Sequence, residues 1–569
     1  MDLKLKFHEC IREVWQQTIL VRCIISLDVE RKGISLVMKK QTFLKGALIL
    51  TIGGIIVKVI GAANRIILSR LLGGEGIGLY QMAYPIYQLA LSVSSAGIPV
   101  AISILVAEKL AFNDQRGARR VFRISLKLMA ATGLIFSMLL YFGASWLIEM
   151  QAVRDVRAYY ALVTLSPAIF FVTILASYRG YFQGMQQMTP TAVSQIAEQF
   201  VRVIVMLFLV IALLPYGLSY AAAGASFGAA PGAVAGVIVL LYYYWKHHRE
   251  CSMAEVMQVS YQQESTYRII MRMIKLALPV SLANIMLPIT ANIDLLIVPA
   301  RLETAGCSVA EATELFGYLT GMAVSLVNMP TILTASLAAS LVPAISESFT
   351  LNDKGRIKLR TETALRIANL LMIPSCVGLY LLALPISEML YATPNAGGSI
   401  AILSCGVILL GIGQVTTGVL QGLGHTTIPL INMMFAAVAK LALSWYLTAL
   451  PDWGLAGAAW ATNADFGVAA VLNLYFLYKY VGVGIHIENT CKVLISACFM
   501  GVVVLLTYDF VMVRLLSNTL ATLTAIFFGG IVYSIVILFT GAMLKRDIES
   551  IPKFGNGLAK FLWKLRLIR

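Results

Sequence analysis

Long apolar segments alternate with short polar loops along almost the whole chain. A helix needs about 20 mostly apolar residues to cross a bilayer, and the sequence holds about fourteen such segments. They cover residues 46–69, 79–106, 124–148, 158–180, 191–214, 219–245, 270–299, 314–345, 364–389, 398–421, 427–449, 455–478, 491–512 and 518–543. The loops between them are too short for a separate soluble domain. The pattern therefore predicts an all-α polytopic membrane protein.

The composition agrees with this prediction. Only 13% of the residues are charged and 59% are hydrophobic, whereas soluble domains have about 25% charged residues. A net charge of +16 would raise the question of nucleic acid in a soluble protein. Here the positive residues gather in short loops between apolar spans, so we expect no nucleic-acid partner.

Signals for enzymatic or metal chemistry are missing from the sequence. The eight cysteines are scattered, without a CxxC pair or a histidine cluster, so neither a disulfide framework nor a zinc site is indicated. There is no GxxxxGK[ST] motif, and "GGEGIG" lies between two spans rather than between a strand and a helix. We expect a protein that is not an enzyme and has no cofactor, and transport that is secondary or driven by a sodium or proton gradient.

The loops differ in charge according to the side on which they would lie. Lysine and arginine are concentrated after spans two, six and eight and in the tail that follows span fourteen. These loops share one side if the spans alternate, and cytoplasmic loops are the basic ones. Both termini are therefore expected in the cytoplasm. Residues 1–37 form a mixed extension ahead of Met38, and we interpret them either as an over-extended start or as a cytoplasmic surface helix.

The chain contains a weak internal repeat. "EGIG" at 75–78 matches "ELFG" at 314–317, and "YFQG" at 181–184 matches "VLQG" at 419–422, with a nearly constant offset of about 238 residues. Six spans separate the copies, so the repeats are parallel. We expect a first lobe at 38–249, a second lobe at 250–482, and two additional helices with a basic tail at 483–569, with a substrate between the lobes.

Span one carries cations at a depth where they are costly. Gly54, Lys58, Gly61 and Arg65 form one stripe on a helix, and a cation near the bilayer centre costs about 2.5–3.5 kcal/mol on insertion scales. Lys58 is either paired with an acid on another span or lines a water-filled cavity that binds an anion. For Arg65 the alternatives are the same cavity, or snorkelling and helix packing.

Four more charged residues lie inside predicted spans. Arg202 in span five and Lys440 in span eleven correspond through the repeat, and we expect them either to line the cavity or, for Arg202, to pair with Glu198 one turn earlier. Asp294 in span seven and Asp465 in span twelve are either counter-ions for these cations or parts of a sodium or proton site. Prolines 279, 288 and 299 are expected to bend or break span seven.

The opening of span one and two later signatures resemble a known family. The stretches are "FLKGALILTIGGIIVKVIGAANRIILSRLLGGEGIG", "SYRGYFQGMQQMTPTAVSQIAEQFVRV" and "VLQGLGHTTIPLINMMFAAVAKL". They resemble the stage V sporulation protein B and MurJ-like oligosaccharide flippases of the multidrug/oligosaccharidyl-lipid/polysaccharide exporter superfamily. The resemblance implies two six-helix lobes in a V shape that move an undecaprenyl-pyrophosphate-linked sugar to the outer leaflet by alternating access.

The resemblance also implies site residues and partners. The MurJ-type pattern R-x-L-G-x-x-R-[DE] corresponds to the run from Lys58 to Arg65, so Lys58, Asn64 and Arg65 would contact the pyrophosphate, because charge-assisted contacts to phosphate are strong. The family's sodium site uses acids of the second lobe, which Asp294 matches, whereas span eleven has only Asn432. The implied partners are a lipid-linked oligosaccharide of the lipid II type, membrane lipids and envelope-assembly proteins. A flippase for another polysaccharide, a drug exporter of the same fold and a non-transporting scaffold are the alternatives.

Overall fold

A computed structural model describes residues 43–95, 97–112, 114–251, 264–484 and 486–542, and every regular element in these ranges is helical. The predicted N-terminal extension and basic tail lie outside the described residues. The first part of the chain forms α2 (Phe43–Ser95), α3 (Ile98–Ala111), α4 (Gln115–Glu149), η1 (Val156–Ala158), α5 (Tyr159–Gly184), α6 (Met188–Leu213), η2 (Leu214–Tyr216), α7 (Leu218–Phe227) and α8 (Ala229–Cys251).

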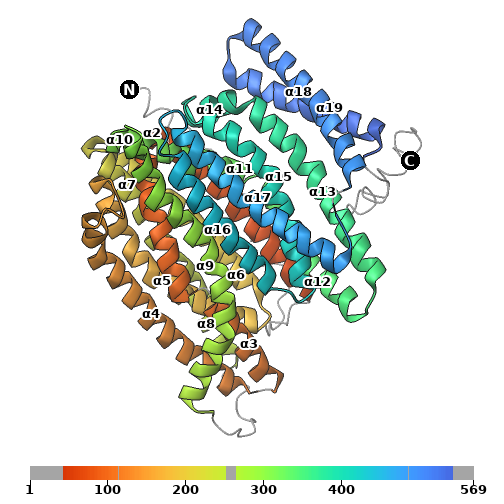
Figure 1. Ribbon diagram of the computed structural model, residues 1–569. Helices are drawn as coiled ribbons and strands as arrows, with labels where there is room; N and C mark the ends of the chain where they lie inside the picture. Colours follow the sequence, from red (N-terminus) through yellow and green to blue (C-terminus); the bar gives the residue numbers. More distant parts are fainter. Residues whose placement is uncertain (1–42, 96, 113, 252–263, 485, 543–569) are drawn as a thin grey trace, which may run out of the picture.

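The second part continues the helical pattern (Figure 1). Its elements are α9 (Thr266–Thr304), α10 (Val309–Phe316), the π-helical segment η4 (Gly317–Ala323), α11 (Val324–Val327), α12 (Thr331–Thr350), α13 (Lys354–Leu381), α14 (Ala383–Tyr391), α15 (Gly397–Gly422), α16 (Thr427–Leu447), α17 (Gly454–Val481), α18 (Ile487–Leu515) and α19 (Asn518–Thr540). The last two pack on each other, and α18 also packs on α13.

The element α2 is a hairpin of two helices rather than one long helix. Gly73 has a left-handed φ of 66°, which only glycine adopts readily. Arg65 and Gln81 lie equally far from Gly73 along the chain, and the Arg65 Nη1 donates a 3.1 Å hydrogen bond to the Gln81 Oε1. In a straight helix these residues would be about 24 Å apart, so the chain reverses at Gly73.

The number of predicted spans agrees with this hairpin. Thirteen helical stretches of the described chain are long and apolar enough to cross a membrane, and the first of them runs from Ile52 to Ala111. Because that stretch reverses at Gly73, it supplies two of the predicted spans. The protein is therefore an all-α, multi-pass membrane protein of the predicted kind.

Two details of spans seven and eight differ from the expectation. Span seven is not broken by its prolines, because α9 is assigned as one helix of 39 residues; transmembrane helices tolerate proline where neighbouring groups take up the freed carbonyls. The Asn292 side chain instead links α9 to α2, because it donates to the carbonyl oxygens of Pro288 at 2.7 Å and Pro85 at 2.9 Å. Span eight is interrupted instead, since α10, η4 and α11 end in a turn and α12 begins after Pro330.

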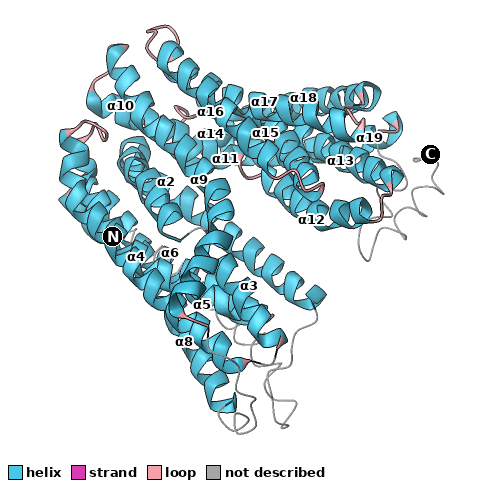
Figure 2. Cartoon of the chain, turned by 60° about the horizontal axis from the view of Figure 1, so that its bottom comes forward, coloured by secondary structure: helices cyan, strands magenta, loops and turns pink. Residues whose placement is uncertain are grey.

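The two groups of helices diverge from each other, with α2 and α9 between them (Figure 2). At one end of the molecule, α2 packs closely on α10, η4 and α14. Glycines permit this approach, because a methyl group on Gly78 would overlap the carbonyl oxygen of Thr313 and one on Gly317 would overlap that of Gly74. No comparable packing joins α3 to α12 within the described part of the chain. Toward the other end, the contact between the lobes runs through α9, which packs on α3.

Ion pairs place the loops on the two ends of the molecule. Arg272 pairs with Glu108 at 2.6 Å, and Lys109 pairs with Glu264 at 3.2 Å, so the loops after spans two and six lie together. The loop after span three lies at the opposite end, where Arg154 contacts Glu303 at 3.3 Å. This grouping agrees with spans that alternate in direction. We call the end with Arg154 the outer end, following the predicted orientation.

Candidate functional site

The two cations of the α2 stripe differ in their contacts: Arg65 has side-chain partners within the hairpin, whereas Lys58 is exposed. The Arg65 guanidinium hydrogen-bonds Gln81 and lies 5.5 Å from the centre of the Tyr80 ring, so it joins the two arms of the hairpin. Lys58 is exposed and has no hydrogen bond or ion pair with any described residue. Space is open beside Gly54, one turn earlier. Lys58 is therefore not paired with an acid on any other described span.

Asn64 points away from this stripe. Its side chain is buried, and its amide donates to the Met206 sulfur on α6 at 3.1 Å. The Asn64 Oδ1 is buried and has no hydrogen-bond partner among the residues that the structure describes. Gly61 also faces α6, at contact distance from Gln199. The structure thus brings Lys58 and Arg65 to one side of α2 and leaves Asn64 in the packing between α2 and α6.

Arg202 belongs to a buried cluster with Arg179 and Glu198. The Glu198 carboxylate accepts hydrogen bonds from Arg202 on the same helix at 2.7 Å and from Arg179 on α5 at 2.8 Å. Close packing holds α8 against this cluster, because a Cβ on Gly232 would lie within 3 Å of Arg202 atoms. Two cations share one carboxylate, so the cluster has one net positive charge inside the first lobe.

The sequence prediction included the local pair between Glu198 and Arg202 as an alternative but did not consider Arg179. The sequence feature that could have indicated Arg179 is its place at the end of predicted span four, in "SYRGYFQG". That position also suits a residue at the membrane surface. Only the packing of α5 on α6 reveals the shared carboxylate.

Lys440, Asp294 and Asp465 meet inside the second lobe. The Lys440 Nζ lies 2.7 Å from the Asp294 Oδ2 and 4.0 Å from the Asp465 Oδ2, and all three residues are buried. They come from α16, α9 and α17, at about 10 to 16 Å inside the outer ends of these helices. Asp294 thus forms an ion pair with Lys440.

A cavity of about 440 Å³ adjoins this cluster. Asp465 lines it, together with amides and hydroxyls on α15 and α17. The Asn473 side chain donates to the Thr417 hydroxyl at 2.9 Å and accepts from Asn432 at 2.8 Å. Asn432 is therefore engaged with α17 rather than with Asp294. Such a hydrogen-bonded wall can hold water beside a membrane-embedded carboxylate.

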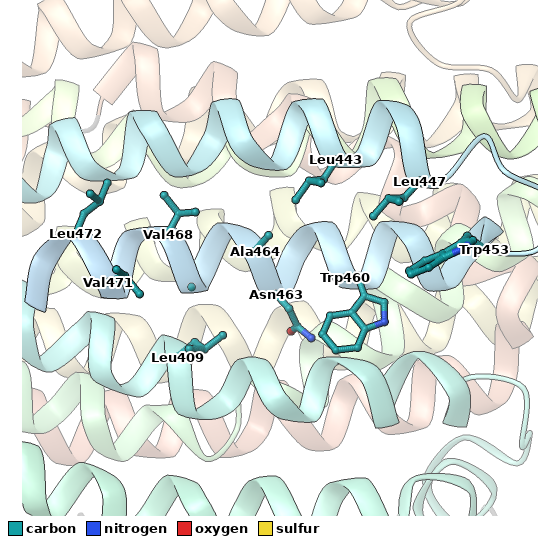
Figure 3. Close-up of a pocket in the computed structure, with 11 residues that line it drawn as sticks. Leu409, Leu443, Leu447, Trp453, Trp460, Asn463, Ala464, Val468, Val471 and Leu472 are labelled. Carbon is teal, nitrogen blue, oxygen red and sulfur yellow. The ribbon is translucent and has the colours of Figure 1, made fainter. Parts of the chain in front are cut away.

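An apolar groove of about 730 Å³ runs along α15, α16 and α17 (Figure 3). Trp453 and Trp460 lie at one end and Val471 and Leu472 at the other. Its single amide, Asn463, donates to the carbonyl oxygen of Ile402 at 2.6 Å. A lining of leucine and valine with tryptophans near one helix end is typical of a surface that contacts lipid chains.

The outer end is held by a second set of charges. Arg157 joins Glu75 at 2.6 Å and Asp155 at 2.7 Å, and Asp155 accepts a 2.9 Å hydrogen bond from Thr313 on α10. Burial by itself would raise the pKa of Asp155, but the hydrogen bonds from Arg157 and Thr313 hold that pKa below its ordinary value of 3.8. These contacts tie α2 and η1 of the first lobe to α10 of the second lobe.

Comparison with known proteins identifies the family. Residues 43–349 match the family described as "Polysaccharide biosynthesis protein". The chain belongs to this family. Stage V sporulation protein B of Bacillus subtilis is 30% identical, over 79% of this chain and 86% of that protein. Lipid II flippase MurJ of the same organism is 27% identical, over 81% of this chain and 87% of that protein.

Solved structures confirm the expected fold. Lipid II flippase MurJ in an inward closed conformation matches with a TM-score of 0.66 at 17% identity, covering 86% of this chain and 98% of that one. An inward-facing multidrug resistance MATE transporter of the MOP superfamily matches with a TM-score of 0.63 at 16% identity, covering 77% and 98%. The predicted two-lobed helical fold is thereby confirmed.

Proposed function

We propose that the protein is a flippase that moves an undecaprenyl-pyrophosphate-linked sugar precursor, of the lipid II type used for peptidoglycan or spore cortex, across the cytoplasmic membrane by alternating access. The observation that carries the proposal is Lys58, which is exposed in the middle of a membrane-spanning helix and has no partner among the described residues. A lone cation at that depth is costly. A pyrophosphate headgroup passing between the lobes would offset that cost.

The distribution of charge supports an anionic cargo. Lys58 and Arg65 have no carboxylate partner among the described residues, and the Arg179–Glu198–Arg202 cluster adds one net positive charge. The buried acids Asp294 and Asp465 of the second lobe are paired with Lys440. The names of two relatives, a lipid II flippase and a stage V sporulation protein, agree with this cargo. The likeness to a multidrug transporter concerns the fold.

The conformation is consistent with an intermediate of alternating access. The lobes are joined at the outer end through α2 with α10, η4 and α14, while toward the other end α3 packs on α9 and not to a comparable extent on α12. In the predicted orientation, with both termini in the cytoplasm, the headgroup would enter from the cytoplasmic side and reach Lys58. Coupling to sodium or protons and binding of envelope-assembly proteins stay predictions.

The test is lipid translocation in proteoliposomes. We expect the wild type and Lys58→Arg to flip lipid II, and Lys58→Ala to lose at least about ten-fold in rate, because one charge-assisted contact to phosphate contributes about 1.5–3 kcal/mol. Lys479→Ala is the matched control, since Lys479 is exposed at the end of α17.

The outcomes separate the alternatives. Equal flipping by the wild type and Lys58→Ala would contradict the role of Lys58. Transport of another undecaprenyl-pyrophosphate glycan instead of lipid II would keep the site and change the cargo. Efflux of a cationic drug without lipid movement would replace the proposal with drug export.

A further inference from the structure

Two membrane-embedded carboxylates close together are the usual setting for a bound cation in a transporter. Asp294 and Asp465 form such a pair in the second lobe, on α9 and α17. A free sodium ion would need their oxygens to converge on an available position. The position between them is taken by the Lys440 ammonium, 2.7 Å from one carboxylate and 4.0 Å from the other.

We propose that Lys440 is a fixed internal cation of the second lobe, so that the acid pair Asp294–Asp465 binds no free sodium ion. The proposal goes beyond the flippase function and is independent of it, because cation binding is measured without a substrate. It predicts that, where a protein of this fold could bind sodium between these two acids, this chain has the ammonium group of a lysine.

Burial keeps the ammonium in place. Only 3% of Lys440 is exposed, and the residue lies two turns inside the outer end of α16. An ammonium at this depth cannot easily move to water, and separating it from Asp294 would leave both charges unpaired. The contacts among the described residues thus make the lysine a permanent occupant rather than a mobile gate.

Repulsion would exclude a second cation from the same position. Two unit charges about 4 Å apart in an effective dielectric constant of about 20 repel enough to weaken binding by roughly a thousand-fold. The neighbouring cavity does not supply an alternative site, because Asp465 is the one ionisable side chain in its lining and the other polar groups there are neutral. A single carboxylate already beside an ammonium is a poor sodium ligand.

Removal of the lysine would leave the Asp294 Oδ1 available as a further ligand oxygen. This oxygen is buried and has no hydrogen-bond partner in the described part of the chain. In a Lys440→Ala variant it would join the Asp294 Oδ2 and the Asp465 oxygens around the space that the ammonium leaves. We therefore expect the variant to gain the sodium site that the wild type lacks.

The experiment measures binding of ²²Na⁺ to the purified full-length protein, together with the unfolding temperature in sodium chloride and in choline chloride at equal ionic strength. The wild type and Lys440→Arg are expected to bind no ²²Na⁺ and to unfold at the same temperature in both salts. Lys440→Ala is expected to bind sodium at least about 100-fold more tightly than the wild type and to unfold at a higher temperature in sodium. Adding Asp294→Asn to Lys440→Ala should remove both effects.

Two results would overturn the proposal. One is saturable ²²Na⁺ binding by the wild type that Asp294→Asn or Asp465→Asn abolishes. The other is a folded Lys440→Ala protein that binds no sodium. If Lys440→Ala does not fold, the wild type and Asp465→Asn decide alone: absence of binding supports the proposal, and binding through Asp465 refutes it.

Discussion

Glu198 is expected to be the most sensitive polar residue of the first lobe, because two arginines depend on it. Its carboxylate pairs with both Arg179 and Arg202, at 2.8 and 2.7 Å, and the three side chains are at most 19% exposed. Replacing Glu198 by Gln keeps the shape of the side chain and removes the charge. Both guanidinium groups would then be buried without a counter-ion.

The expected cost follows from the geometry. Removing one member of a buried ion pair costs about 3–5 kcal/mol, because the remaining charge is left uncompensated. Glu198→Gln should therefore destabilise the protein by about that amount or more. Removing Arg179 or Arg202 singly leaves the carboxylate paired with the other arginine, so Arg179→Met and Arg202→Met should each cost only about 1.5–3 kcal/mol, the contribution of one charge-assisted hydrogen bond.

The assay is reversible unfolding in mixed micelles of lipid, detergent and dodecyl sulfate, with the free energy of unfolding measured for each variant. Gln199→Met on the same helix is the matched control, because it also keeps the size of the side chain and removes no charge. The reasoning would be refuted if Glu198→Gln were no more destabilising than either arginine variant. That result would mean that the arginines find other partners, such as water in a cavity.

Two further predictions concern the outer end. Gly78→Ala should lower the unfolding temperature and increase the accessibility of α10 to proteases, because the added methyl group overlaps the carbonyl oxygen of Thr313. Gly54→Ala is the control, because the space beside Gly54 is open. Equal effects of the two substitutions would contradict the close-packing argument. At pH values above its ordinary pKa of 3.8, ionised Asp155 should stabilise the folded protein, and this contribution should be lost as the pH falls through the lower pKa of the folded state. The free energy of unfolding should therefore change less with acid pH for Asp155→Asn than for the wild type. Parallel acid profiles would show that the contacts of Asp155 with Arg157 and Thr313 contribute nothing to stability.

The sequence by itself was sufficient for the fold class, the spans and the family. Hydropathy finds membrane helices because every backbone polar group in the bilayer must be satisfied within its own segment, which makes a span a local property of the chain. Charge in the loops is local in the same sense, and the repeat is found by comparing one segment of the sequence with another. The pair between Glu198 and Arg202 could be anticipated because both residues lie on one helix.

Tertiary structure decided which charges meet. Lys440 and Asp294 are 146 residues apart and become partners only when α16 packs on α9 at one particular rotation. The same holds for Arg179, which reaches Glu198 through the packing of α5 on α6, and for Asn64, which turns to α6 although it neighbours Arg65. Helical periodicity gives the face of each residue along its own helix, but the neighbour of that face depends on the packing of segments distant in the sequence. That packing made Lys440 the partner of an acid pair and left Lys58 without one.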